Sequence, residues 1–506
     1  MTTPIPQPPG IPLLGNIFVI NPSNTWASLK ILAEKYGEQI KSFSVVPRSG
    51  PISLLINGDS LTLRLGEIFQ VKVLGKTIVF VAGAALAGEL CDEKRFRKFV
   101  GGPIVEIRHT VHDSLFTAFD HEASWGIAHR IIAPQLAPGR VADMFDEMRD
   151  ATVELVRKWQ GGQLSHTGAV NRVSPIDELN RLNLEVTART LFGTKLGCLT
   201  GPEHPAIRGM EDATSEAMKR PTRPGFLNWL VYGGKFNRAT DTLRSWAAEM
   251  VSRRKESLAS PSSTEAGRRD LLWALLNAQD PETGKSFTES QVIDEIVTMP
   301  IGSSTAPGLL SSALYYLAEN PEVVVRARRE LDGVVGRGKP LRHAHMARLR
   351  YVEAVLRESM RLTFPAPGFN IEPIPRADPA DRSPVLLGGG RYAVAHNQAM
   401  IIVLAGVNRD PTVFENPLAF IPERMMDGDG VGALEKLPLG AQRWFGNGKR
   451  ECIGKHWAHQ FCFVVLATLM WEFDFEKADP DYELKQDGWF NLRPIDFYVK
   501  VRPRAD

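Results

Sequence analysis

Apolar residues recur every three or four positions along most of the chain beyond about residue 84, which is the spacing of amphipathic helices. This spacing predicts helices over residues 24–36, 141–159, 240–258, 289–317, 321–335, 352–362 and, almost wholly apolar, 452–473. Alternating apolar residues rich in valine predict a β-hairpin over 69–81. Strand-like patterns return over 365–402, around the turn GGGR, and over 481–504. The pattern therefore predicts a mainly α fold with minor β structure.

The chain shows no internal repeat and no linker long enough to separate domains. We therefore expect one large domain over residues 1–506. The segment 38–66 fits least well, because its mixed serine and leucine residues follow no amphipathic period. We interpret this segment as an insertion or as an artefact of the gene model.

Composition narrows the class of protein by exclusion. The formal net charge is +2 and lysine and arginine are spread along the chain, so nothing predicts a nucleic-acid partner. No stretch reaches about 18 consecutive apolar residues, so we expect no membrane-spanning anchor. The N-terminal segment MTTPIPQPPGIPLLGN is proline-rich and does not resemble a signal peptide. With the cysteines expected as free thiols, these features predict a cytoplasmic protein.

One cysteine is set apart by its neighbours. Cys452 lies in the segment FGNGKRECIGK, among glycines and charged residues, whereas Cys91, Cys198 and Cys462 are expected to be buried and inert. A thiolate can act as a nucleophile or as a metal ligand, and the local sequence favours the ligand. Glycines let the backbone approach a flat group, and Arg450 can pair with an acidic group on the same cofactor. A single thiolate beside a planar acidic cofactor is typical of haem–thiolate ligation.

The order F-G-x-G-x-R-x-C-x-G resembles the haem-binding signature of the cytochrome P450 superfamily. The resemblance implies a single large triangular helical fold with small antiparallel sheets, and a haem b cofactor whose iron takes Cys452 as its axial thiolate. It also implies that Phe445 lies at the cofactor and that Arg450 holds a propionate. The segment WGIAH resembles the family's tryptophan and basic residue that hold the propionates, here Trp125 and His129. Arginine is commoner than histidine at the second of these positions.

Two further segments match the family in the expected order. Glu358 and Arg361 lie three residues apart on a predicted helix, and this spacing places both on one face. Taken alone, two oppositely charged residues at this spacing are commonly an exposed ion pair on the surface of a helix. In the family an arginine from a later segment, here FIPERM, joins the pair, which implies a structural cluster of Glu358, Arg361 and Arg424.

The resemblance covers nearly the whole chain and is narrower than the superfamily. CDEKRF, HDSLFTAF, NRDPTVF and FIPERM recur in similar form in the fused, self-sufficient fatty-acid hydroxylases of fungi and bacilli. Those enzymes continue into flavin-binding reductase domains, whereas this chain stops at Asp506 with no fused reductase domain. We therefore expect electrons to come from a separate flavoprotein NADPH reductase.

The predicted central helix departs from the family. The family usually places a small residue, a glycine, an acid and a threonine over the haem, where they kink the helix and relay protons. Gly302 and Thr305 match, but Ser304 stands in place of the acid and the bulky Ile301 in place of the small residue. Two prolines in this segment each remove a helix hydrogen bond. The segment fits either a hydroxylase in which water and Thr305 carry protons, or an enzyme that has lost efficient oxygen activation.

The resemblance also implies the residues on the substrate side. Phe116 matches an aromatic residue beside the oxidised end of the substrate, although core packing explains its apolar side chain equally well. Lys76 matches an entrance arginine that pairs with a fatty-acid carboxylate in the bacillar relative, and Phe80 matches a neighbouring aromatic that carries a hydroxyl there. Ile301 and Ala366 are expected to line the pocket. The expected substrate is a small apolar molecule with a long chain, and a fatty acid is one candidate.

Three hypotheses for function remain in competition. The first is a haem–thiolate monooxygenase that hydroxylates this long-chain substrate. The second is an oxygen-independent isomerase or dehydratase, or a peroxygenase, none of which needs the same proton relay. The third is a haem-binding protein without turnover. Activity with NADPH and a reductase, compared with activity on peroxide alone, distinguishes the first two.

Overall fold

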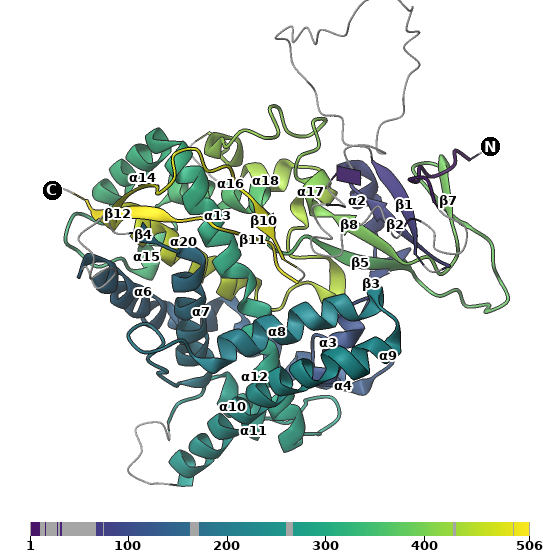
Figure 1. Cartoon of the computed structure of the whole chain (residues 1–506), viewed down its shortest axis with the longest axis horizontal. Helices are drawn as coiled ribbons and strands as arrows, with labels where there is room; N and C mark the ends of the chain where they lie inside the picture. Colours follow the sequence, from purple (N-terminus) through teal and green to yellow (C-terminus); the bar gives the residue numbers. More distant parts are fainter. Residues whose placement is uncertain are drawn as a thin grey trace, which may run out of the picture. The chain divides into compact units, whose positions relative to one another are not determined.

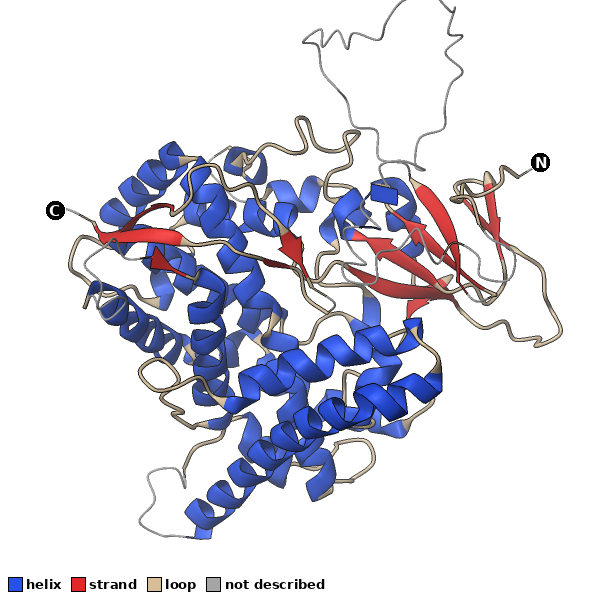
Figure 2. Cartoon of the chain, viewed as in Figure 1, coloured by secondary structure: helices blue, strands red, loops and turns tan. Residues whose placement is uncertain are grey.

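The computed structural model of the 506-residue chain describes residues 2–10, 16, 28, 31–32, 67–73, 75–161, 172–259, 267–428, 432–488 and 490–504. Within them helices predominate over strands (Figure 2), so the expected mainly α fold with minor β structure is confirmed. The expected insertion over 38–66 and most of the helix expected over 24–36 lie outside the described residues. The described chain divides into two units, and the expectation of a single domain stays a prediction.

Unit 1 comprises Met1–Arg97, Gly368–Ala419 and Leu437–Trp444, and its centre is a five-stranded sheet. The strand order is β1 (Ile68–Val73), β2 (Lys76–Val81), β8 (Met400–Val403), β5 (Gly368–Pro373) and β3 (Phe96–Lys98), labelled in Figure 1. β1 and β2 pair antiparallel, which confirms the predicted hairpin. β2 also pairs in parallel with β8, a strand far along the sequence, with Val79 opposite Met400.

Short elements complete unit 1. The GGGR turn joins β6 (Val385–Leu387) to β7 (Tyr392–Val394) in a second, two-stranded sheet, as the sequence pattern predicts. The helices of this unit are α2 (Ala84–Leu90), α17 (Leu404–Val407) and α19 (Leu439–Gln442). The core of unit 1 includes the stacked rings of Phe69 and Phe80, whose centres are 5.0 Å apart.

Unit 2 comprises Lys98–Pro367, Phe420–Lys436 and Phe445–Asp506 and holds most of the helices. The helices are α3 (Ile104–Val111), α4 (Ala123–Ile132), α5 (Pro138–Asp143), α6 (Phe145–Gln160), α7 (Pro175–Phe192), α8 (Pro205–Lys219), α9 (Gly225–Leu227), α10 (Gly233–Ala259), α11 (Leu271–Asn277), α12 (Glu289–Ser303), α13 (Thr305–Glu319), α14 (Pro321–Val334), α15 (His343–Met346), α16 (Arg350–Thr363), α18 (Ala433–Lys436) and α20 (Lys455–Glu472). Small sheets pair β4 (Arg172–Val173) and β9 (Phe473–Lys477) with β12 (Val499–Pro503), and β10 (Gln486–Asp487) with β11 (Arg493–Pro494). No helix among the described residues is long and apolar enough to cross a membrane.

The helix α20 forms the centre of unit 2. Its residues are buried on every side from Gln460 to Trp471, as expected of a helix that is apolar all round. It packs against α6, α14 and α16. It begins at Lys455, three residues after the predicted start, so Cys452 lies in the turn before the helix.

The helical segment predicted over 289–317 forms α12 and α13, which are separated at Ser304, so the interruption expected from the two prolines of this segment is present. Pro307 explains the break. A proline has no N–H to donate, but the first turn of a helix leaves its N–H groups unpaired. Because α13 begins at Thr305, Pro307 falls within that first turn. The helix predicted over 141–159 is likewise divided, into α5 and α6, at Met144.

A buried charge cluster joins α16 to the short 3₁₀ helix Pro422–Met425. Arg361 donates from Nη2 to Glu358 Oε1 at 2.7 Å and from Nε to Oε2 at 2.8 Å. Arg424 Nε and the Ile421 N–H each donate to Glu358 Oε1 at 3.0 Å. The side chains of Glu358 and Arg361 are 0% exposed. The structure therefore brings together the three charged residues that the resemblance implies, in a site where an unpaired charge is strongly unfavourable.

We predict that Arg361→Met lowers the free energy of unfolding by about 3–5 kcal/mol, because it leaves the buried Glu358 carboxylate with one arginine instead of two. Urea denaturation followed by circular dichroism measures the loss. Arg326→Met is the matched control, since Arg326 pairs with Glu423 through a side chain that is 51% exposed. The control should lose no more than about 1 kcal/mol. Equal losses in the two variants contradict the role of the buried cluster.

Candidate active site

The chain makes a tight turn immediately before α20. The Cys452 N–H donates to the Phe445 carbonyl oxygen at 2.9 Å and closes this turn. Gly446 and Gly448 take φ values of +84° and +67°, in the left-handed region that glycine adopts without strain. A Cβ atom on Gly446 would lie 2.8 Å from Lys98 Nζ, so a larger residue would also displace this lysine. The turn therefore depends on glycine at two positions.

Gly454 differs from these two glycines. Its φ is −89°, a value that any residue adopts. No atom lies within 4 Å of the place where its Cβ would be. What distinguishes Gly454 is the open space beside it, two residues after Cys452.

Cys452 differs from the other three cysteines in its exposure. It is exposed, whereas Cys91, Cys198 and Cys462 are buried, as predicted. Desolvation by the surrounding chain raises the pKa of the Cys452 thiol, while Lys98 and the Gly454 N–H lower it. A metal ion bound at the sulfur would displace the thiol proton, and Lys98 and the N-terminal end of α20 would stabilise the thiolate.

Arg450, Trp125 and His129 lie together, as the resemblance implies. The Arg450 guanidinium carbon is 5.1 Å from the centre of the Trp125 ring. The Trp125 and His129 rings stack with their centres 5.1 Å apart and their planes at 24°. Arg450 also donates from Nε to Asp120 Oδ1 and from Nη2 to the Ala118 carbonyl, each at 2.7 Å. These contacts hold the guanidinium in place beside the half-buried tryptophan.

His129 differs from the arginine commoner in the family in its charge. Burial, and then the nearby Arg130, lower the pKa of His129, so the ring is neutral at pH 7. A neutral imidazole can donate one hydrogen bond to an anion but does not add positive charge. The positive charge near Trp125 comes instead from Arg450 and from Lys449, whose Nζ is 5.2 Å from the centre of the Trp125 ring.

At the break between α12 and α13 several residues are exposed or half-buried, whereas their neighbours on both helices are mostly buried. Ile301 is 1% exposed and packs in the core, whereas Gly302 is exposed and Ser304 and Thr305 are half-buried. Ser304 Oγ donates to the Ile301 carbonyl at 2.7 Å and accepts from Asn491 Nδ2 at 2.5 Å. Ser304 is therefore engaged on both sides. Contact of Ile301 and Thr305 with a cofactor stays a prediction.

The residues predicted on the substrate side fall in different units. Phe116 in unit 2 meets Phe490 edge to face, with ring centres 6.0 Å apart. Ala366, also in unit 2, is exposed. Lys76 in unit 1 is exposed and makes no ion pair among the described residues. The assignment of these residues to the substrate stays a prediction.

The sequence did not identify several residues that the structure places near the predicted ones. Lys98 donates from Nζ to the Arg450 carbonyl at 2.8 Å, and Asp120 binds the Arg450 side chain. Asn491 binds Ser304 from the far end of the chain. Lys98 lies in the segment CDEKRFRK and Asp120 in the segment FDHE, but no spacing rule in the sequence connects either segment to residue 450. Only the tertiary fold brings these segments together.

Comparison with known proteins assigns the family. The cytochrome P450 family model matches residues 57–501, so the chain belongs to the cytochrome P450 family. It is 33% identical over 514 residues to a bifunctional cytochrome P450/NADPH–P450 reductase of Acremonium egyptiacum, a match that covers 100% of this chain and 44% of that protein. It is 32% identical to a self-sufficient cytochrome P450 monooxygenase of Phanerodontia chrysosporium, over 100% of this chain and 43% of that protein. A bifunctional enzyme of Fusarium oxysporum is 34% identical, over 99% of this chain and 43% of that protein. The chain thus spans less than half the length of these relatives.

Membership of the family implies a haem–thiolate cofactor, and the described residues fit such a group. Cys452 is the exposed cysteine of the chain, and nothing lies within 4 Å of a Cβ at Gly454 or Gly302. Arg450 pairs with Asp120 and lies against Trp125, and Lys449 beside the same ring adds a positive charge that suits an acidic planar group. Cys452 would bind the iron, and Arg450, Trp125 and His129 would hold the acidic edge.

We predict that Cys452→Ala abolishes the red-shifted Soret band that thiolate-ligated haem gives when the reduced protein binds carbon monoxide. The reason is that only Cys452 exposes its sulfur to a ligand. Cys462→Ala is the matched control, because Cys462 is buried within α20. Difference spectra of the two variants at equal haem content measure the effect. Loss of the band in both variants, or its persistence in Cys452→Ala, contradicts the assignment.

Proposed function

We propose that this chain is an oxidoreductase, a monooxygenase that inserts one oxygen atom from O₂ into a C–H bond of a long-chain apolar substrate, with a fatty acid as the leading class. The observation that carries the proposal is the single exposed thiol of Cys452, held in a glycine turn at the start of a buried helix. The haem that this thiol would bind supplies the oxygen chemistry. The residues of the chain hold the cofactor, exclude water and orient the substrate.

The substrate class is supported by the chemistry of the proposed pocket. Phe116 and Phe490 provide a rigid apolar wall, which suits an alkyl chain. Lys76 offers an exposed ammonium without an ion-pair partner among the described residues, which suits a carboxylate. Phe80 is 3% exposed and stacks on Phe69, so its ring serves packing in unit 1 rather than capture of a carboxylate. Lys76 is therefore the residue that we propose to recognise the carboxylate.

Electrons for this reaction come from NADPH through a flavoprotein reductase. The printed names of the relatives join a cytochrome P450 to an NADPH–P450 reductase in one protein. The separate reductase expected from the sequence stays a prediction, and so does the cytoplasmic location.

A second candidate function is favoured by the state of Ser304. This residue replaces the usual acid, and its hydroxyl donates to the Ile301 carbonyl rather than remaining available. A peroxide-using, isomerising or dehydrating enzyme does not need an acid at this position. The same Ser304 contact is compatible with a monooxygenase in which water and Thr305 deliver protons slowly.

We predict that Lys76 makes a fatty acid bind more tightly than its methyl ester. An exposed ion pair contributes roughly 0–1 kcal/mol, so the preference should be no more than about fivefold. Spectral titration with dodecanoic acid and methyl dodecanoate measures the ratio of the two Kd values. Lys76→Ala should remove the preference and Lys76→Arg should keep it, because arginine retains the charge. Equal binding of acid and ester to the unmodified protein contradicts the anchor.

We predict that the protein with NADPH, a surrogate reductase and ¹⁸O₂ forms ¹⁸O-labelled product from dodecanoic acid, but with poor yield per NADPH. General acid catalysis commonly raises a reaction rate by a factor of about 10²–10⁴, and Ser304 supplies no acid. Ser304→Glu should therefore raise the product formed per NADPH, and Asn491 can donate to the new carboxylate as it does to Ser304.

Ser304→Gln is the matched control for this experiment, because glutamine has the size of glutamate without its acid. It should leave the yield as low as in the unmodified protein. High yield in the unmodified protein contradicts the idea that the helix lacks a proton donor. Product that forms only with peroxide, and without ¹⁸O from O₂, contradicts the monooxygenase and supports the second candidate.

A further inference from the structure

Three residues of α12 each hold one residue of the loop that carries Phe116. Asp294, Glu295 and Thr298 are 2%, 2% and 6% exposed. The loop runs over 112–117 and follows the end of α3. All of these residues belong to unit 2. The sequence pattern marks this part of α12 only as helical, so the polar character of its buried face requires an explanation.

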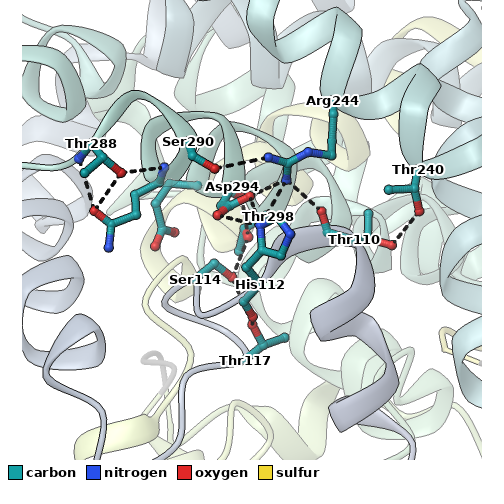
Figure 3. Close-up of polar contacts among 12 residues, drawn as sticks. Thr110, His112, Ser114, Thr117, Thr240, Arg244, Thr288, Ser290, Asp294 and Thr298 are labelled. Atoms are coloured by element: carbon teal, nitrogen blue, oxygen red, sulfur yellow. Dashed lines mark hydrogen bonds and ion pairs between the residues drawn. The ribbon is translucent and has the colours of Figure 1, made fainter. Parts of the chain in front are cut away.

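Two of the three contacts are visible in Figure 3. Both carboxylate oxygens of Asp294 lie 3.1 Å from His112 Nδ1. Arg244 of α10 also pairs with Asp294, so this carboxylate joins α10, α12 and the loop (Figure 3). Thr298 Oγ1 lies 2.9 Å from Ser114 Oγ (Figure 3).

The third contact involves Glu295. Its Oε1 accepts from the Leu115 N–H at 2.7 Å, and Leu115 directly precedes Phe116. Its Oε2 is buried and has no hydrogen-bond partner among the described residues. Burial raises the pKa of Glu295 from its ordinary 4.5 to about 8; the Leu115 N–H lowers it, and the charges of Asp294 and Asp113 raise it. The carboxyl group is therefore neutral at pH 7, in a site where an ionised carboxylate would lack a counter-ion.

The loop does not adopt this conformation by its own preference. His112 takes φ +43° and ψ −123°, a left-handed backbone conformation that is unfavourable for a residue other than glycine. Such strain persists only where surrounding contacts determine the conformation. Here the contacts come from α12, at His112, Ser114 and Leu115, and from the loop itself, where Thr117 Oγ1 donates to the His112 carbonyl at 2.6 Å.

We propose that Glu295 is a positioning residue: in its neutral form it holds Leu115 against α12, and so sets where Phe116 lies and which carbon of an apolar chain is oxidised. The consequence for oxidation rests on the proposed function, whereas the attachment of Leu115 does not. Asp294 and Asp113 are the charged groups that face Glu295; Arg244 pairs with Asp294, and the His112 ring contacts the same carboxylate.

The attachment should depend on pH in a definite direction. The pKa of Glu295 is higher in the closed loop than it would be in an opened, solvated loop. The neutral carboxyl therefore stabilises the closed loop fully below the ordinary pKa of 4.5, and this stabilisation is lost as pH rises to about 8. Above that pH the closed loop has its lowest, constant stability.

Hydrogen–deuterium exchange of the Leu115 amide in the haem-loaded 506-residue chain tests the proposal. The protection factor, which corrects for the intrinsic effect of pH, should fall by about tenfold or more between about pH 6 and pH 8 in the unmodified protein. Glu295→Gln keeps the acceptor oxygen but cannot ionise, so its protection should stay constant over this range. Glu295→Leu removes the acceptor and should lower protection at about pH 6 by roughly two- to tenfold.

Glu289→Gln is the matched control, because it makes the same chemical change on the same helix at a side chain that is 62% exposed. It should follow the unmodified protein at every pH. The carbon monoxide difference spectrum checks that each variant folds and binds haem. A Glu295→Gln variant that keeps the pH dependence of the unmodified protein overturns the proposal, and so does unchanged Leu115 protection in Glu295→Leu.

Product distribution provides the second readout. With dodecanoic acid, the ratio of hydroxylation positions should shift between about pH 6 and pH 8 in the unmodified protein and stay constant in Glu295→Gln. If dodecanoic acid is not oxidised at all, the proposed function fails while the exchange measurement still decides the attachment of Leu115. A constant product ratio in the unmodified protein, together with pH-dependent protection, overturns the link from Leu115 to Phe116.

Discussion

The candidate active site depends on one constraint: the single sulfur atom of Cys452 must lie just before the N-terminus of α20, a helix that is buried on every side. α20 can be buried because its residues from Gln460 to Trp471 are mostly apolar. The turn that leads into the first residue of α20 requires Gly446 and Gly448 to take left-handed conformations. That turn leaves Cys452 exposed, near Lys98. The same arrangement makes the sulfur a ligand that a bound iron would deprotonate and the fold would stabilise.

The surrounding charges support this arrangement in two different ways. The cluster of Glu358, Arg361 and Arg424 is fully paired and buried, so it fixes how α16 meets the segment at 421–425. The Arg450 side chain is 6% exposed and pairs with Asp120, and it lies against the half-buried Trp125 ring. The first group stabilises the fold, and the second is the one expected to meet the cofactor.

Polar groups on α12 and α13 are arranged differently from the pattern usual in the family. Ser304 has no acid to offer and is engaged with Asn491, while two buried carboxyl groups lie earlier on α12, at Asp294 and Glu295. These acids contact the loop of Phe116 rather than the helix break. The polar side chains of α12 thus hold the loop of Phe116, and proton supply by water and Thr305 at the break stays a prediction.

Local patterns were enough to predict the hairpin of β1 and β2, the apolar α20 and the mainly α fold, because each follows from periodicity over a few residues. The cysteine turn was predictable for the same reason, since its residues are adjacent in the sequence. The break at Ser304 was predictable in part, because Pro300 and Pro307 are visible in the sequence and predict a kinked helix, whereas the residue at which it occurs depends on Pro307 falling in the first turn of α13. The contacts of Lys98 with residue 450, of Asn491 with Ser304 and of Glu295 with Leu115 join distant segments, and no local rule predicts them.

Resonance Raman spectroscopy of the ferric protein, prepared with natural and with ³⁴S-labelled cysteine, tests the central claim most directly. If the Cys452 thiolate binds the haem iron, the spectrum contains an iron–sulfur stretching band that moves to lower frequency with the heavier isotope. The band should be present in Cys462→Ala and absent from Cys452→Ala. A haem-loaded protein with no isotope-sensitive band, or with the same band in Cys452→Ala, contradicts thiolate ligation by this cysteine.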